Sequence, residues 1–254
     1  MRSLESKYGR ATPPVVPHPD NMFELSVEQF ASMFHTAALG VRTDRELVKF
    51  ECDRVLNSGY TFQAFNIEST YIDYAGELLG DGLQLMVPIS YPVGGQTLLK
   101  RMKDMEYTVA HRADQCCVTI NFTAALTGRY DIIEQECRAM HSTFDPDLHI
   151  IDIVPATLFT AKELIEVCKA VQAGGGYHLK VNPGYGLGST FEEIALIKRV
   201  FGDHFIIDPS GGIRSMHDVY EMYKRGCSVI HSQQTFVLID KFREMKEKGE
   251  RYDD

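Results

Sequence analysis

The sequence lacks several features that would place it in other classes of protein. No run of about 18 apolar residues occurs, so we predict no membrane-spanning helix and no membrane partner. Residues 1–20 lack the apolar core of a secretory signal, so we expect a cytoplasmic protein. Basic residues do not predominate, since 26 Lys and Arg stand against 35 Asp and Glu, and the net charge of −9 argues against a nucleic-acid partner.

The cysteines form no recognisable metal or disulfide motif. No CxxC pair occurs, so the sequence predicts neither a structural zinc site nor a redox motif. A chain of this length without a secretory signal rarely depends on disulfides, so we expect free thiols that act as small apolar side chains. The six cysteines are Cys52, Cys116, Cys117, Cys137, Cys168 and Cys227.

What is present is typical of a globular protein with one large domain. Hydrophobic residues make up 44% of the 254 and charged residues 24%, enough for a sizeable core. Residues 1–22 contain four prolines and predict an irregular N-terminal arm, because proline interrupts both helices and central strands. We therefore expect an arm at 1–22 and a single domain at 23–254. The prolines are Pro13, Pro14, Pro17 and Pro19.

Short apolar runs alternate with longer amphipathic stretches along this domain. Strands that are apolar throughout and alternate with helices indicate a parallel sheet covered on its faces. Seven or eight such units in about 220 residues favour a (β/α)8 TIM barrel, with a doubly wound open sheet as the second choice. The predicted strands are 61–66, 83–90, 116–122, 149–154, 177–182, 204–209 and 228–233, with 34–39 as a weaker eighth.

Helix-start signals precede several of the amphipathic stretches. Thr43 followed by Glu46 and Thr160 followed by Glu163 have the spacing of a capping box, and Gly174 is a helix stop. The predicted helices are 43–58, 160–173, 189–201 and 215–225.

Lys180 lies in the middle of a predicted strand, between two apolar residues. Alternation along 177–182 places His178, Lys180 and Asn182 on one face, which we expect to point into the barrel mouth. A buried lysine either pairs with a carboxylate or, with its pKa lowered by burial, acts as a nucleophile that forms an imine. Spacing alone slightly favours the first interpretation.

Two glycine-rich loops follow consecutive predicted strands. The first, NPGYGLGST, contains Gly184, Gly186 and Gly188, and the second, PSGGIRS, contains Gly211 and Gly212. Such loops let backbone N–H groups approach an anion, and late loops of a barrel often hold a phosphate. The same glycines would also serve simple tight turns.

The stretch 177–232 resembles deoxyribose-phosphate aldolase and its relatives. HLKVNPGYGLGST resembles the family's Schiff-base strand and glycine turn, IDPSGGIRS its next strand, and SYPVGG and HRADQCCVTIN two earlier segments. The resemblance covers most of residues 34–234. It implies a (β/α)8 barrel, a Schiff-base (class I) aldolase without metal or cofactor, and Lys180 as the amine that forms an imine with the substrate.

The sequence departs from the family at several positions. Asp208 stands where the family has a second lysine, and Cys117 stands where it has a catalytic aspartate. The acid of the family's first strand aligns near Phe34. His231, Gln233 and Gln234 replace smaller residues in the last phosphate loop, which puts a terminal phosphate in question.

From these residues we predict a class I aldolase, a lyase of carbohydrate metabolism that makes or breaks a C–C bond in a small hydroxyaldehyde or sugar-derived substrate. Lys180 and Asp208 are the expected catalytic residues, with Asp208 transferring a proton to or from the imine. Homo-oligomers are the usual assembly, so we expect one here. The expected substrate-binding residues are Asn66, Asn121, His178, Asn182, Gly184, Gly211, Gly212, His231 and Ser232.

Other interpretations of the same residues remain open at this stage. An isomerase or dehydratase would use Asp208 as base and charged Lys180 to stabilise an oxyanion. Asp208 and Lys180 could instead form an inert buried ion pair in a barrel that only binds a ligand. The residue types of His178, Asp208 and His231 would also suit a metal, although the resemblance is to a metal-free family.

Overall fold

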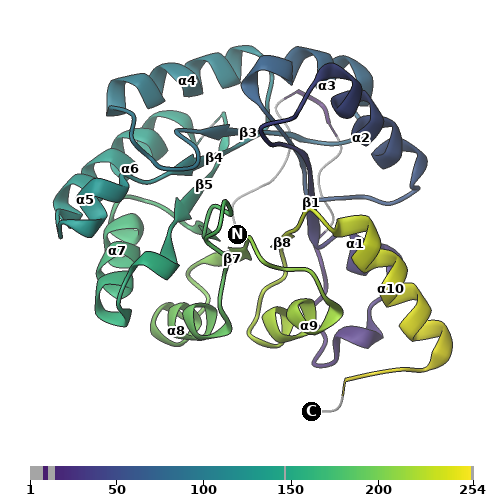
Figure 1. Ribbon diagram of the computed structural model, residues 1–254. Coiled ribbons are helices and arrows are strands. Elements are labelled where there is room, and N and C mark those ends of the chain that lie inside the picture. The colour runs from purple at the N-terminus through teal and green to yellow at the C-terminus, as the bar shows by residue number, and fades with distance from the viewer. Residues whose placement is uncertain (1–7, 11–14, 146, 253–254) are drawn as a thin grey trace.

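The computed structural model shows eight parallel strands arranged in a ring and surrounded by helices (Figure 1). It describes residues 8–10, 15–145 and 147–252. The strands are β1 (Phe34–Ala38), β2 (Phe65–Ile67), β3 (Leu85–Ile89), β4 (Gln115–Thr119), β5 (His149–Val154), β6 (His178–Val181), β7 (Ile206–Pro209) and β8 (Ile230–His231).

The sheet closes on itself. Each strand from β1 to β6 pairs with the next one in the chain, β1 pairs with β8, and a bridge from Ser210 to His231 joins the end of β7 to β8. The predicted (β/α)8 barrel is confirmed, including the weaker first strand. The open doubly wound sheet is wrong, because its first and last strands would not pair.

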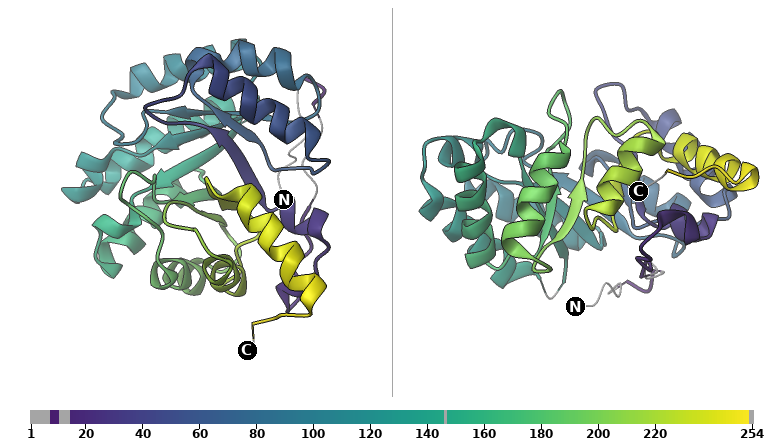
Figure 2. Two further views of the ribbon diagram at one scale, coloured as in Figure 1. Left: turned by 45° about the vertical axis from the view of Figure 1, so that its right-hand side comes forward. Right: turned by 90° about the horizontal axis from the view of Figure 1, so that it is seen from below.

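Helices cover the outside of the ring (Figures 1 and 2). They are α1 (Val27–Ala31), α2 (Arg45–Asn57), α3 (Ile72–Leu79), α4 (Leu98–Ala110), α5 (Phe122–Leu126), α6 (Tyr130–Phe144), α7 (Ala161–Ala173), α8 (Phe191–Phe201), α9 (Met216–Lys224) and α10 (Thr235–Lys248). Short 3-10 turns are η1 (Met22–Glu24), η2 (Ser69–Tyr71) and η3 (Ala156–Leu158).

Capping side chains start the helices where the sequence predicted them, with one exception. Thr160 and Glu163 form the predicted capping box, and α7 ends at Gly174. At α2 the cap is Asp44, whose side chain accepts from the backbone N–H of Leu47. The assignment of Thr43 as the cap was wrong, because the chain turns one residue later.

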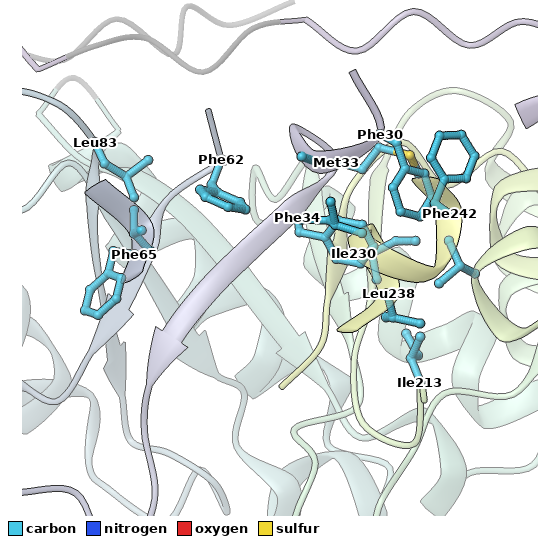
Figure 3. Close-up of a cluster of buried hydrophobic side chains, with 14 of the residues drawn as sticks. Phe30, Met33, Phe34, Phe62, Phe65, Leu83, Ile213, Ile230, Leu238 and Phe242 are labelled. Atoms are coloured by element: carbon cyan, nitrogen blue, oxygen red, sulfur yellow. The ribbon is translucent and has the colours of Figure 1, made fainter. Parts of the chain in front are cut away.

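The main apolar core lies between the barrel and its helices. Figure 3 shows Phe30, Phe34, Ile230 and Phe242 packed where α1 and α10 cover β1 and β8. The rings of Phe30 and Phe242 stack with centroids 4.0 Å apart. All six cysteines are free and buried, so their prediction as small apolar side chains is confirmed.

The described part of the N-terminal arm packs on its own barrel. Arg10 forms an ion pair of 2.9 Å with Asp114, at the start of β4, and His18 stacks on Tyr223 of α9. Residues 15–21 belong to no helix or strand, while 1–7 and 11–14, with Pro13 and Pro14, lie outside the described residues. A search of the described helices finds none with the length and apolar character needed to cross a bilayer.

One half of the barrel interior holds an apolar cluster together with the buried polar side chain of Asn66, and the other half holds a group of buried titratable side chains. Strands β2 to β5 and the residues beside them contribute a buried cluster of Ala64, Met86, Cys117, Ile151 and Ile153. Strands β6, β7, β8 and β1 contribute five buried polar side chains, His178, Lys180, Asp208, His231 and His35. Polar groups are costly to bury, so this half of the interior is where chemistry is expected.

Candidate active site

A cavity of about 660 Å³ opens at the carboxyl ends of the strands, between the loops that follow β1, β3, β6, β7 and β8. Six of the predicted site residues line it: Lys180, Gly184, Gly211, Gly212, His231 and Ser232. Its polar wall also includes Tyr91, Tyr185, Ser210, Arg214, Gln233 and Gln234. Among the described residues no Asp or Glu belongs to this lining, so the formal charges at the wall are those of a lysine and an arginine.

Lys180 reaches this cavity from β6. Its neighbours Leu179 and Val181 point outward into the core between barrel and helices, as alternation along the strand predicts. Only 2% of Lys180 is exposed, and its Nζ lies 3.2 Å from Nδ1 of His231. The amine therefore sits in a desolvated site at the wall of an open pocket, where an incoming carbonyl carbon can reach it.

Asp208 lies behind the cavity wall rather than in it. It is the register partner of Lys180 on β7, it is fully buried, and it is not part of the cavity lining. No ion pair within 4.0 Å joins the two side chains, although both belong to the described residues. The simple buried Lys180–Asp208 ion pair that the sequence allowed is therefore not formed.

The surroundings of Asp208 favour its protonated form. Burial raises the pKa of Asp208 to about 7, against the opposing effect of the positive charge of Lys180. The titratable side chain beside it is His35, whose Nε2 lies 3.7 Å from Oδ2. Both carboxyl oxygens lack a hydrogen-bond partner among the described residues. Asp208 can thus take up or give up a proton near neutral pH.

His35 is a site residue that the sequence analysis missed. It lies on β1 in register with His231, and the two rings face each other with centroids 5.4 Å apart. Burial, with the nearby charge of Lys180, lowers the pKa of both histidines well below 6.5, so both are neutral. The available signal was alternation along 34–39, which puts His35 on the face opposite to Phe34, the position aligned with the family's acid.

Four other predicted residues lie outside the cavity lining. Asn66 is buried in the barrel interior and contacts Sγ of Cys117 at 3.6 Å. Asn121 caps α5, and His178 lies deeper in the interior, 2.8 Å from His149. Asn182 accepts a hydrogen bond from Thr157 and donates one to Glu193 of α8. Its φ of +67° ends the strand geometry, so alternation no longer determines where its side chain points.

The two glycine-rich loops pack backbone against backbone. Gly211 has φ +75°, and a Cβ there would lie 2.6 Å from the carbonyl oxygen of Leu187 in the other loop. Substitution with alanine must therefore separate the loops and strain the backbone.

We expect Gly211→Ala to cost about 1–3 kcal/mol of stability and to weaken substrate binding. Thermal unfolding and KM measure the two effects. Gly202→Ala, at a positive φ with no atom near the added carbon, controls for backbone strain alone. An equal KM for the two variants would contradict the role of Gly211 in shaping the cavity.

The metal alternative finds no support in the geometry. No three His, Cys, Asp or Glu side chains within 8–10, 15–145 and 147–252 lie close enough together to hold a metal ion. The position aligned with the family's catalytic aspartate is a fully buried thiol. Burial raises the pKa of Cys117, so it stays protonated. What remains is an amine beside a neutral imidazole, with a carboxyl of raised pKa behind them.

Sequence comparison finds the same family of proteins. No known protein-family model matches the chain. It is 27% identical over 186 residues to a deoxyribose-phosphate aldolase of Staphylococcus epidermidis, a match that covers 72% of this chain and 84% of that protein. It is 24% identical over 215 residues to the enzyme of that name from Clostridium perfringens, covering 84% and 95% of the two chains.

Structural comparison agrees on the fold. The chain superposes with a TM-score of 0.77 on the tetrameric deoxyribose phosphate aldolase from Aeropyrum pernix. The match covers 87% of this chain and 93% of that one at 18% identity. At this identity the likeness supports the barrel architecture.

Proposed function

We propose that this chain works through an imine formed on Lys180. The premise is that the chain is a divergent member of the deoxyribose-phosphate aldolase family, and hence an aldolase and a lyase. The observation that carries this proposal is the placement of the amine. It is desolvated, it lines an open cavity, and it lies beside a neutral imidazole rather than a carboxylate. An imine acts as an electron sink when a C–C bond is formed or broken next to it.

The neighbouring groups supply the proton transfers that imine formation needs. Nζ of Lys180 attacks the carbonyl carbon while the carbonyl oxygen takes up a proton, and the resulting hydroxyl leaves as water after a second proton transfer. His231 lies 3.2 Å from Nζ and is neutral, so it can accept the proton that the amine loses and return it to the departing hydroxyl. Asp208, with its pKa of about 7, can store the proton that the lysine gives up before attack.

The cavity wall suits a small polar substrate. Backbone N–H groups of the glycine loops and the side chain of Arg214 favour an anionic or hydroxyl-rich end. The amides of Gln233 and Gln234 can both donate and accept hydrogen bonds. We therefore propose a hydroxyaldehyde or sugar-derived substrate, with a phosphate accepted by the glycine loops where it carries one.

Reductive trapping tests the imine directly. Sodium borohydride added in the presence of acetaldehyde or glycolaldehyde should leave a stable alkyl group on Lys180, identified by peptide mass spectrometry. A panel of small aldehydes and ketones that leaves Lys180 unmodified would contradict the proposal.

His231→Ala tests the role of the imidazole. We expect the rate of imine formation to fall by about 10²–10³-fold, because the proton acceptor beside the amine is lost. Gln234→Ala, a change in the same loop, is the control and should affect KM more than the trapping rate. A His231→Ala variant that traps acetaldehyde as fast as wild type would exclude His231 from proton transfer.

The isomerase or dehydratase alternative is less favoured by the geometry. It needs Asp208 in contact with the substrate, and Asp208 does not line the cavity. The two mechanisms also differ in what they need at position 180. An imine requires a lysine amine, whereas a charge stabiliser can be arginine.

We also propose that the protein works as a homo-oligomer in a reducing compartment such as the cytoplasm. Six free buried thiols suit a reducing compartment, and a structural relative assembles as a tetramer. The described part of the arm packs on its own barrel, so the interface we expect is between barrel surfaces.

A further inference from the structure

A line of polar side chains crosses the barrel interior from behind the cavity wall to the opposite end. It runs from Asp208 through His35 and His178 to His149 and Tyr177. His178 is the first residue of β6 and His149 the first of β5, so both lie at the amino ends of the strands, away from the cavity mouth. His149 and Tyr177 are partly exposed there, while the other three are buried. The line therefore leads from Asp208 to solvent at the far end of the barrel.

Two of its links are direct hydrogen-bond contacts. The hydroxyl of Tyr177 lies 2.8 Å from Nδ1 of His149, and Nε2 of His149 lies 2.8 Å from Nδ1 of His178. At the other end, Nε2 of His35 lies 3.7 Å from Oδ2 of Asp208. His149 thus uses one ring nitrogen for each of its two neighbours, which is the arrangement that a proton relay needs, and His178 and His35 each keep a second nitrogen without a partner among the described residues.

The middle of the line consists of buried polar atoms that no protein group satisfies. Nε2 of His178, both nitrogens of His35 and both oxygens of Asp208 have no hydrogen-bond partner among the described residues. Burial lowers the pKa of both His178 and His35 well below 6.5, and the nearby His35 further disfavours a charge on His178. Buried polar atoms of this kind are where proteins hold internal water.

We propose that His35, His178 and His149, with internal water between the first two, form a proton path that connects Asp208 to solvent at the amino end of the barrel. The inference rests on the proposed function, because the path serves the proton that imine chemistry moves. The histidines are positioning residues, since they act through Asp208 and do not line the cavity.

The path transfers protons only, so no oxidant or reductant is needed. The acid proton of Asp208 passes to Nε2 of His35 while the Nδ1 proton leaves through water to Nε2 of His178. The Nδ1 proton of His178 then passes to Nε2 of His149, and the Nδ1 proton of His149 leaves through Tyr177 to solvent. Every imidazole ends neutral, and the reverse sequence restores the starting state. Asp208 can in this way exchange its proton while a substrate occupies the cavity.

Deuterium uptake separates this role from imine formation. Acetaldehyde bound as an imine on Lys180 loses an α-proton and takes up deuterium from D2O, which NMR follows. We expect His178→Phe to slow this uptake at least about tenfold while the rate of borohydride trapping on Lys180 changes less than about twofold. Added imidazole should restore uptake in His178→Ala. His204→Gln, which changes a histidine at the same end but off the path, should match wild type in both assays.

Three results would overturn the inference. One is uptake in His178→Phe as fast as in wild type. Another is a His178 variant in which the rate of deuterium uptake and the rate of borohydride trapping fall together and added imidazole restores neither. This would show that His178 has a purely structural role. The last is a wild-type protein that traps no carbonyl compound on Lys180. That result overturns the proposed function and the path with it, whereas the first two leave the imine on Lys180 standing.

Discussion

Lys180→Ala should abolish borohydride-trapped adducts and lower aldol cleavage or formation by roughly 10³-fold or more, the scale on which loss of a nucleophile acts. The physical reason is that the described cavity wall holds no other amine that can form an imine, since its other basic side chain, Arg214, carries a guanidinium. Steady-state kinetics and peptide mass spectrometry give the two readouts. Lys198→Ala, which removes a partly exposed lysine of α8 that pairs with Asp203, is the matched control and should keep full activity.

Lys180→Arg completes this test. Arginine keeps the positive charge but cannot form the imine, so it should be as inactive as the alanine variant. Activity retained with arginine would show that the residue acts as a charge, as an isomerase or dehydratase would use it. Circular dichroism of both variants checks that the barrel has folded.

Asp208→Asn should raise the free energy of unfolding at alkaline pH and leave it nearly unchanged at acidic pH. Burial raises the pKa of Asp208 to about 7, whereas the unfolded chain has an ordinary aspartate near 3.9. At a pH between these two pKa values, Asp208 therefore holds its proton in the folded state and loses it in the unfolded state. The stabilising contribution of this carboxyl is full below about pH 4 and is lost as pH rises through about 7.

The size of this effect follows from the shift. Wild type should lose up to about 4 kcal/mol relative to Asp208→Asn between pH 4 and pH 8, since each unit of pKa corresponds to about 1.4 kcal/mol. Urea unfolding across this pH range measures the difference in the free energy of unfolding between the two proteins. The contributions of the other titrating groups are the same in both and cancel. Asp81→Asn, which changes an exposed carboxyl, is the control. A difference between wild type and Asp208→Asn that does not vary with pH would contradict the raised pKa.

The fold could be predicted from local patterns because several βα units carry their own signals. Apolar runs marked the strands, and side chains such as Thr160 and Ser215 marked helix starts through hydrogen bonds made within one turn. These interactions are short in range, so they survive in the sequence as fixed spacings. The error at Thr43 arose where two neighbouring residues could both cap, and only the turn decides between them.

The candidate site was predictable where strand alternation held and unpredictable where it ended. Lys180 and His231 were placed correctly at the cavity because each lies within a strand. Asn182 was not, since its left-handed φ redirects the side chain toward Glu193. His35 was overlooked because its strand has the weakest apolar pattern and its importance comes from contacts with β7 and β8.

By itself, the sequence determined the order of strands and helices, the buried lysine at the end of β6 and the two glycine loops, since these depend on neighbours along the chain. Only the tertiary structure decided that Asp208 stands behind the cavity wall, that the amine faces His231, and that histidines from β1, β5 and β6 share the interior. Closure of the barrel brings together residues 35 and 208, and a distance of that kind depends on strand register and tilt, which no local spacing encodes.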